Sequence, residues 1–311
     1  MGNMMATRDA YGEALEKLGS TNKDVVVLDA DLSGSTKTAA FGKAYPDRFF
    51  NVGIAEQNLI ATAAGLATTG KIPFASTFAV FATGRAFEII RNSVCYPELN
   101  VKIAATHAGL TVGEDGATHQ SVEDISLMRS LPNMVVLNPA DGIEAKQCIY
   151  KAAEHDGPVY IRLGRSKVPN IFDENYEFEI GKAVELREGN GVTLIATGIM
   201  VAKALEAAET LAEEGISARV INMSTIKPID EDIIIKAAKE TKGIVTIEEH
   251  SVIGGLGSAV AEVLAKNHPT HMGIIGIEDS FGESGDADTL LERYGLDTEK
   301  IVSEVKRIIG K

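Results

Sequence analysis

Residues 51–67 read NVGIAEQNLIATAAGLA, and the expected architecture of the chain is built outward from this stretch. A short apolar and aromatic run ends at a glycine, and a helix is predicted from about Ala55 through a series of small residues. Small side chains let another backbone approach a helix closely. Glu56 lies in the first turn of this helix and is the only acidic residue between Asp47 and Glu88.

Two interpretations of Glu56 follow from this position. A carboxylate in the first turn of a helix can simply face the positive end of the helix dipole, which stabilises the helix by a few tenths to about 1 kcal/mol. A carboxylate held in low-dielectric surroundings can instead share a proton with a ligand. The rest of the sequence has to decide between the two.

The chain has 311 residues, which is long for one ordinary core and predicts two domains. Its hydrophobic content of 45% and charged content of 24% are typical of a soluble globular protein. The sequence has neither an apolar run of about 18 residues nor a signal peptide, so no membrane insertion is expected. Cys95 and Cys148 fall in predicted helices and are interpreted as reduced core thiols of a cytoplasmic protein.

The net charge of −14 argues against nucleic acid as a partner, because binding a phosphate backbone requires a basic surface. This charge is compatible with small anionic ligands, which a few local arginines can hold. Arg8 and Arg165 lie at opposite ends of the first predicted domain. They are ordinary surface arginines unless the fold makes them converge on an anion.

Apolar runs of strand length alternate with helical patterns, which predicts an α/β fold of two doubly wound domains with mostly parallel sheets. In the first domain we expect strands at 25–28, 72–78, 101–106, 134–137 and 159–163, and helices near 7–18, 37–44, 85–94 and 142–155. In the second we expect strands at 192–196, 218–222, 244–248 and 274–277, and helices near 200–214, 231–239 and 256–266. Periodicity fails between 165 and 181, so the expected domains are 1–170 and 183–311, with a linker at 171–182.

Open α/β sheets bind ligands beyond the carboxyl ends of their strands, so the loops after the strands should carry the chemistry. The stretches of interest there are the loop DADLSGS at 29–35 after the first strand, Phe78 and Phe81 at the second, and His107, Asp115 and His119 around a glycine-rich loop at 109–121.

Several of these groups can have either a purely structural role or a ligand-binding role, and the residues alone do not decide between the two. The two phenylalanines can be core residues or an apolar cradle for a flat heteroaromatic ring. The acids of the glycine-rich loop can be a solvated turn. His107 and His119 are twelve residues apart, which is not a zinc spacing, so they are expected to hydrogen-bond a polyhydroxylated ligand or to move protons.

Gly254-Gly255-Leu256-Gly257 follows a predicted strand and opens a predicted helix, as a dinucleotide-binding loop would. It lacks a third glycine at the right spacing and an acid at the expected place. Tight packing of the helix on the strand is therefore the better interpretation of this run.

Five stretches taken in order are GIAEQN at 53–58, STFAVF at 76–81, ATHAGLTVGEDGATHQS at 105–121, RSLPNMVVLNPADG at 129–142 and RLGRSKVP at 162–169. With them the chain resembles the transketolase family of thiamine-diphosphate enzymes over essentially its whole length. The resemblance is to the second half of a usual transketolase, a pyrimidine-binding domain followed by a C-terminal domain. The family holds its metal and diphosphate with a Gly-Asp-Gly motif, which this sequence lacks, so the resemblance implies a split enzyme with a separate partner chain.

The resemblance also implies roles for the cofactor-binding residues. Glu56 matches the glutamate that contacts N1′ of the aminopyrimidine, a contact that lets the 4′-nitrogen take the C2 proton of the thiazolium. Phe78 and Phe81 match the aromatic side of the pyrimidine pocket. Gly84 stands where the family often has a third aromatic residue.

For the substrate, the resemblance implies two sets of contacts. His119 and Asp115 match residues that bind substrate hydroxyls, and His119 is expected to be catalytic together with Glu56. The cluster that binds the sugar phosphate corresponds to Arg8, Ser35, His107 and Arg165. A separate contact, which the family makes to the cofactor across the subunit interface, corresponds to Asp31 and Leu32.

The resemblance thus predicts the C-terminal subunit of a two-chain transketolase of the pentose phosphate pathway, which moves a two-carbon ketol unit from a ketose phosphate to an aldose phosphate. The expected assembly is a heterotetramer whose partner binds a divalent metal, Mg or Ca. The alternatives are a β-type subunit of another thiamine-diphosphate enzyme, such as deoxyxylulose-phosphate synthase, and a non-catalytic partner subunit. The pair His119-Gln120 favours transketolase over the synthase, and the retained Glu56 weighs against a non-catalytic role.

Overall fold

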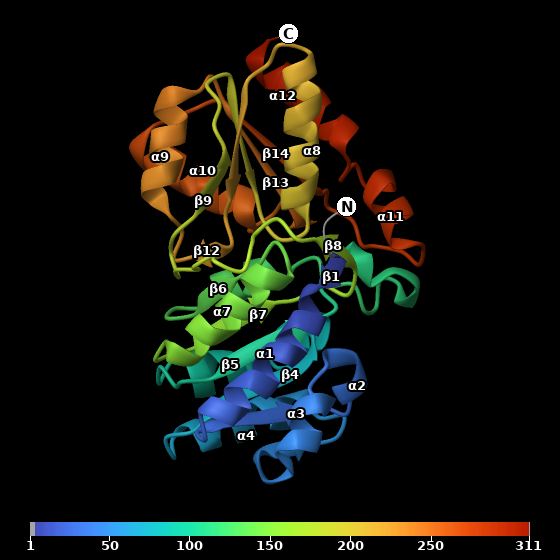
Figure 1. Cartoon of the computed structure of the whole chain (residues 1–311), viewed down its shortest axis with the longest axis vertical. Coiled ribbons are helices and arrows are strands. Elements are labelled where there is room, and N and C mark those ends of the chain that lie inside the picture. The colour runs from blue at the N-terminus through green and yellow to red at the C-terminus, as the bar shows by residue number, and fades with distance from the viewer. Residues whose placement is uncertain (1–3, 311) are drawn as a thin grey trace.

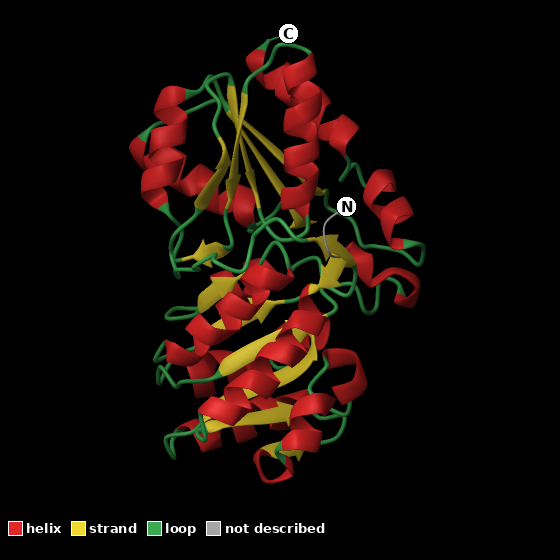
Figure 2. Cartoon of the chain, viewed as in Figure 1, coloured by secondary structure: helices red, strands yellow, loops and turns green. Residues whose placement is uncertain are grey.

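The computed structural model describes residues 4–310 and shows two α/β sections stacked along the long axis of the molecule (Figure 1). The section that contains most of the N-terminal half is built on a seven-stranded sheet, and the other is built on a five-stranded sheet. Helices flank the strands in both sections (Figure 2). The predicted α/β class with mostly parallel sheets is confirmed.

The first sheet has the order β12-β6-β7-β5-β4-β2-β3 and is parallel except for β12, which runs antiparallel to β6. Its strands are β2 (Val25–Asp29), β3 (Phe49–Asn51), β4 (Ile72–Phe78), β5 (Lys102–Thr106), β6 (Val135–Leu137), β7 (Val159–Arg162) and β12 (Thr225–Lys227). Its helices are α1 (Thr7–Thr21), α2 (Ser33–Thr36), α3 (Ala39–Ala44), α4 (Glu56–Ala67), α5 (Phe87–Ile89), α6 (Asp124–Arg129) and α7 (Gly142–Glu154). Four short turns of 3₁₀ or π type are η1 (Pro46–Arg48), η2 (Phe81–Arg85), η3 (Ile90–Cys95) and η4 (Leu110–Asp115).

The second sheet has the order β14-β13-β10-β11-β9 and is parallel except for β9, which runs antiparallel to β11. Its strands are β9 (Val184–Arg187), β10 (Val192–Ala196), β11 (Ala218–Asn222), β13 (Ile244–Ser251) and β14 (Met272–Ile277). Its helices are α8 (Met200–Glu213), α9 (Glu231–Glu240), α10 (Leu256–Asn267), α11 (Ala287–Arg293) and α12 (Thr298–Ile309). A separate pair, β1 (Met4–Ala6) and β8 (Lys167–Pro169), is antiparallel.

The central strands are buried along their whole length, as expected when helices cover both faces of a parallel sheet. One apolar core continues from the first section into the second. It contains Leu59 of α4 and Ile103 of β5 together with Ile234 of α9 and Val260 of α10. The two sections are therefore packed as one body, and β12 of the second half of the chain lies in the first sheet.

The helix predicted after Ala55 begins at Glu56 and ends at Ala67, as expected. Two other predicted helices are present but differ in detail. The helix expected at 37–44 is α3, which begins at Ala39, because Lys37 has a φ of 71° and separates it from α2. The helix expected at 85–94 consists of the short α5 followed by the π turn η3, and Arg85 closes the preceding π turn η2. An apolar pattern does not distinguish the wider π turn from an α turn.

The segment expected as a linker is irregular and is attached to the rest of the chain at a few points. Phe178 is only 2% exposed, and the backbone N–H groups of Ile171 and Phe172 donate to the carboxylate of Asp141 at 2.6 and 2.9 Å. The expected division of the chain at 170 and 183 stays a prediction.

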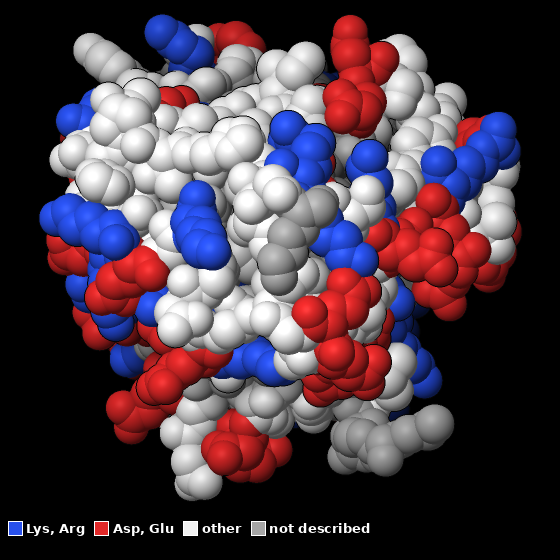
Figure 3. All heavy atoms as spheres, turned by 90° about the horizontal axis from the view of Figure 1, so that it is seen from above, with Lys and Arg blue, Asp and Glu red and all other residues white. Residues whose placement is uncertain are grey.

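Cys95 and Cys148 are free and buried, as the sequence predicts for core thiols. Within residues 4–310 no helix is long and apolar enough to cross a membrane. On the face shown in Figure 3, acidic and basic side chains are interspersed, and no continuous basic stripe runs across the described residues of that face.

Candidate active site

Parallel pairing of β4 and β5 brings an aromatic pair and a histidine to one edge of the first sheet. Phe78 is aligned with Thr106, so His107 follows directly beside Phe78. The rings of Phe78 and His107 stack with centroids 3.8 Å apart, and Phe81 stacks on Phe78 with centroids 6.0 Å apart and planes 11° apart. Phe78 is 6% exposed and Phe81 is half-buried. The two predicted phenylalanines therefore form one aromatic wall.

Glu56 is joined to this wall by Arg85, which the sequence analysis did not single out. Glu56 is only 3% exposed, and Nη1 of Arg85 donates to its two carboxylate oxygens at 2.9 and 2.8 Å. The guanidinium carbon of Arg85 lies 4.9 Å from the centre of the Phe81 ring. Of the two interpretations of Glu56, the structure supports a buried carboxylate, but one that is ion-paired rather than isolated.

His107 is buried and held in one tautomer. Nη1 of Arg8 lies 2.9 Å from Nε2, and Oγ1 of Thr106 lies 2.8 Å from Nδ1. Because an arginine can only donate, Nε2 accepts and Nδ1 carries the proton, which is donated to Thr106. Burial and the nearby charges of Arg8 and Arg165 lower the pKa of His107 to about 3. The ring is therefore neutral at physiological pH.

Arg8 and Arg165, far apart in sequence, come together at this edge of the sheet. Arg8 also donates to the backbone oxygen of Ser35 at 3.3 Å, and its buried Nε has no hydrogen-bond partner among the described residues. Burial lowers the pKa of Arg8; the charge of Asp9 raises it and that of Arg165 lowers it. An orphaned donor on one of two neighbouring cations is an arrangement that an anion would stabilise.

The glycine-rich loop carries Asp115 and His119 to the same place. Gly113 and Gly116 have φ values of 82° and 75°, which favour glycine and let the loop fold back on itself. The ring of His119 then meets the ring of Phe81 edge-on, with centroids 5.3 Å apart. The carboxylate of Asp115 lies 3.7 Å from Nη1 of Arg165.

Asp31 and Leu32 share the loop that carries Ser35. Asp31 accepts a hydrogen bond from Asn51 at 2.9 Å, and the N–H of Leu32 donates to Asp29 at 2.6 Å. Asp29 is fully buried and also accepts bonds from the hydroxyls of two threonines of this loop, at 2.6 and 2.8 Å. Burial raises the pKa of Asp29. The sequence analysis missed this supporting role, although Asp29 directly follows the strand predicted at 25–28.

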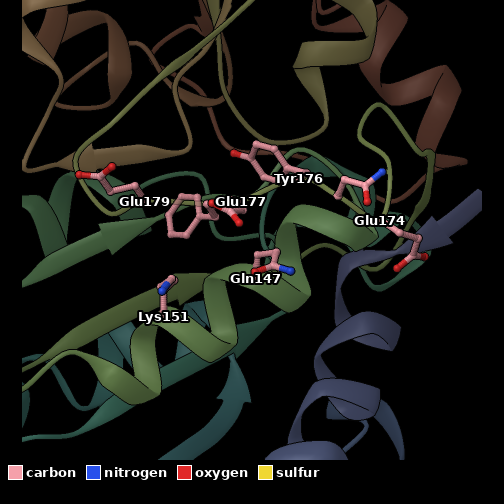
Figure 4. A pocket seen from close by; sticks show the side chains of 8 residues that line it. Gln147, Lys151, Glu174, Tyr176, Glu177 and Glu179 are labelled. Carbon is pink, nitrogen blue, oxygen red and sulfur yellow. The ribbon is translucent and has the colours of Figure 1, made fainter.

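A cavity of about 830 Å³ lies elsewhere, between α7 and the segment at 174–179 (Figure 4). None of the residues predicted for the site lines it. The candidate site is thus defined by contacts between side chains and not by this cavity. In the described part of the chain, no three His, Cys, Asp or Glu residues are grouped so that they could hold a metal ion.

The chain matches two family models that cover most of its length. Residues 3–170 match the transketolase pyrimidine-binding domain, and residues 181–301 match the transketolase C-terminal domain. A protein of Methanocaldococcus jannaschii named for a transketolase C-terminal section is 58% identical over 98% of this chain and 96% of its own length. A 6-deoxy-6-sulfo-D-fructose transketolase subunit of a Clostridium species is 46% identical over 95% of this chain and 92% of its own.

A solved structure described as a split-gene transketolase, in an inactive β4 tetramer, is 59% identical with a TM-score of 0.93 and covers 98% of this chain and 99% of its own. Human transketolase is 37% identical, and this chain matches 50% of its length. Fold, matched domains and relatives define an α/β protein with a pyrimidine-binding section and a C-terminal section. The chain belongs to the transketolase family and corresponds to its C-terminal section.

Proposed function

We propose that this chain is the C-terminal subunit of a two-chain, thiamine-diphosphate-dependent transketolase, which transfers a two-carbon ketol unit from a ketose phosphate to an aldose phosphate. We place the protein in the cytoplasm and in the pentose phosphate pathway. The observation that carries the proposal is a continuous run of contacts from Glu56 through Arg85, Phe81, Phe78 and His107 to Arg8.

The residues fit an aminopyrimidine ring. Such a ring needs apolar faces and a hydrogen-bonding edge, which the stacked Phe78 and Phe81 and the buried Glu56 can provide. A Cβ atom added at Gly84 would have no neighbour within 4 Å, so the place of the family's third aromatic residue is open space. Once bound, thiamine diphosphate would supply the electron sink for breaking and forming the carbon–carbon bond.

Each side chain then has a defined task. Once the cofactor is bound, Glu56 would hold a proton at N1′ of the pyrimidine, in surroundings that leave only 3% of the residue exposed to water. His119 stands edge-on to Phe81 and, with Asp115, is placed to bind substrate hydroxyls. His119 is the better candidate for moving a proton, because His107 is kept neutral and its two nitrogens are already engaged.

The anionic end of the sugar phosphate is assigned to Arg8 and Arg165, with His107 and Ser35 beside them. The orphaned Nε of Arg8 and the proximity of the two guanidinium groups support this assignment, since a phosphate would satisfy the donor and offset the repulsion. Holding the phosphate fixes where the ketose carbonyl lies, which is the positioning part of catalysis. Asp31 and Leu32 are assigned to the cofactor contact across the subunit interface.

The proposal includes a separate N-terminal subunit that carries the Gly-Asp-Gly motif, the diphosphate site and a divalent metal, Mg or Ca. The absence of that motif from the sequence and the match to half of human transketolase support this division. We propose a heterotetramer with two chains of each kind. The inactive β4 state described for the split-gene relative supports the requirement for the other subunit.

The test is to titrate the diphosphate-binding subunit into this chain with thiamine diphosphate and Mg²⁺ and to follow two-carbon transfer between sugar phosphates. We expect no turnover by either chain alone and a plateau at a 1:1 ratio. Turnover by this chain alone would overturn the split-enzyme proposal. A complex that forms but remains inactive with sugar phosphates would favour the non-catalytic alternative.

A further inference from the structure

The glycine-rich loop at 109–121, which carries Asp115 and His119, is anchored to the C-terminal section as well as to its own. In Figure 1, α11 lies next to the short helical turn of this loop, although the two are far apart in sequence. Two attachments cross between the sections. One is made by Glu249 on β13, and the other by the segment at 282–285 that precedes α11.

Glu249 binds the start of the loop. Its Oε1 accepts the backbone N–H of Thr111 at 2.6 Å, and both residues are 3% exposed. A Cβ atom at Gly109 would lie only 2.3–2.5 Å from the carboxylate atoms of Glu249, so a glycine is required where the loop passes this side chain. The loop backbone therefore packs directly against the carboxylate of Glu249.

Glu249 is itself held from the first sheet, through its backbone oxygen and through a charge near its carboxylate. Nη2 of Arg162 donates to the backbone oxygen of Glu249 at 2.9 Å, and Nη1 lies 4.0 Å from its Oε2. Arg162 also donates through Nε to the fully buried Asp124 at 2.8 Å. A buried, charge-paired carboxylate of this kind has little freedom to move, so it defines the position of the Thr111 amide.

The other end of the loop is held through Gln120. Its Nε2 donates to Leu110 and Gly113 inside the loop, at 3.0 and 3.3 Å, and to the backbone oxygen of Glu283 at 2.9 Å. A Cβ atom at Gly282 would lie 2.0 Å from Oε1 of Gln120. Both ends of the loop are thus tied to the C-terminal section.

We propose that Glu249 is a positioning residue: through it the C-terminal section holds the glycine-rich loop so that Asp115 and His119 meet the substrate. The substrate part of this inference rests on the proposed function, whereas the anchoring of the loop does not. The inference gives the C-terminal section a task at the active site, in addition to its part in assembly.

The neighbouring residue provides a matched control. Glu248 is on the same strand and is also fully buried, but its carboxylate accepts the N–H groups of Leu256 and Gly257, at 2.7 and 2.8 Å, at the start of α10. Its contacts are thus made within its own section. Glu248 and Glu249 share residue type, burial and strand, and they differ in whether they hold the glycine-rich loop.

The experiment compares Glu249→Ala with Glu248→Ala in the full chain by hydrogen–deuterium exchange and mass spectrometry. We expect exchange of the loop at 109–121 to rise by about 10-fold or more in Glu249→Ala and by less than about 2-fold in Glu248→Ala, because only the first loses a loop anchor. Glu249→Gln keeps an acceptor oxygen for Thr111 and should restore much of the protection. Equal loop exchange in the two alanine variants would overturn the proposal.

In the reconstituted enzyme, Glu249→Ala should raise KM for the sugar phosphate donor by about 10-fold, whereas Glu248→Ala should not. An unchanged KM with a loosened loop would overturn the link between anchoring and substrate binding. If the wild-type enzyme showed no two-carbon transfer, the proposed function would fail while the exchange result still decided the anchoring. Should Glu249→Ala not fold, Glu249→Asp, which shortens the side chain by one methylene and withdraws its carboxylate from the Thr111 N–H, must loosen the same loop, and a loop left protected in that variant would overturn the proposal.

Discussion

One nitrogen of Arg85 bridges both carboxylate oxygens of Glu56, at 2.9 and 2.8 Å, while the same guanidinium lies over the ring of Phe81. Glu56 is 3% exposed, whereas the side chain of Arg85 is 52% exposed. The pair neutralises a carboxylate that burial would otherwise penalise. In this chain on its own, Arg85 therefore contacts both Glu56 and Phe81, two residues that we assign to binding the aminopyrimidine.

Arg85→Ala should lower the free energy of unfolding by about 1 kcal/mol, because it leaves a buried carboxylate unpaired but removes a partner that solvent already screens. Urea denaturation of the full chain measures this change. Arg91→Ala is the matched control, since Arg91 is an exposed arginine of the turn η3 whose side chain hydrogen-bonds only to its neighbour Asn92 among the described residues. Equal stability of the two variants would show that the Glu56–Arg85 pair is energetically neutral.

Arg165→Ala should raise KM for phosphorylated sugars by about 10-fold or more and change kcat little, because a charge-assisted bond to the phosphate is lost in both the ground state and the transition state. Steady-state kinetics of the reconstituted enzyme provide the measurement. Lys167→Ala removes an exposed cation two residues away and should leave KM unchanged. Wild-type kinetics in Arg165→Ala would exclude Arg165 from the phosphate contact.

The pKa of His107 predicts a dependence of stability on pH. Its value is about 3 in the folded chain and about 6.5 when unfolded, so between these values the unfolded chain binds more protons. The stability gained from keeping the ring neutral is fully present above pH 6.5 and is lost as the pH falls toward 3. Relative to His107→Asn, wild-type stability should therefore fall by up to about 1.4 kcal/mol more per pH unit in this range. Parallel curves from urea denaturation at pH 7 to 4.5 would contradict this.

The sequence predicted the elements whose local pattern was strong. Glu56 at the start of α4 followed from the glycine before it and the run of small residues after it. Phe78 and His107 could be placed at the same edge, because parallel strands end together, and Phe78 closes one predicted strand while His107 directly follows another. The proximity of Arg8 and Arg165 did not follow from the residues alone, since it depends on how α1 packs beside the end of β7.

The residues that the sequence did not reveal act through tertiary contacts. Arg85 reaches Glu56 from the last residue of the π turn η2, and its place at the start of a predicted helix did not indicate this contact. Glu249 looks like any residue at the end of a buried strand, and only the fold shows that it faces the loop at 109–121. Asp29 supports its loop by bonds to residues further along the chain, which spacing does not predict.

The central claim is that Glu56 shares a proton with a bound pyrimidine, and turnover of Glu56→Gln in the reconstituted enzyme tests it most directly. Glu88→Gln, which changes an exposed glutamate of α5, is the matched control, and circular dichroism confirms that both variants are folded. We predict that Glu56→Gln lowers kcat by about 10²–10⁴-fold, as expected when a proton-transfer group is lost, while Glu88→Gln keeps wild-type turnover. A kcat of Glu56→Gln close to that of the wild type would contradict the account and leave Glu56 as a helix-dipole residue.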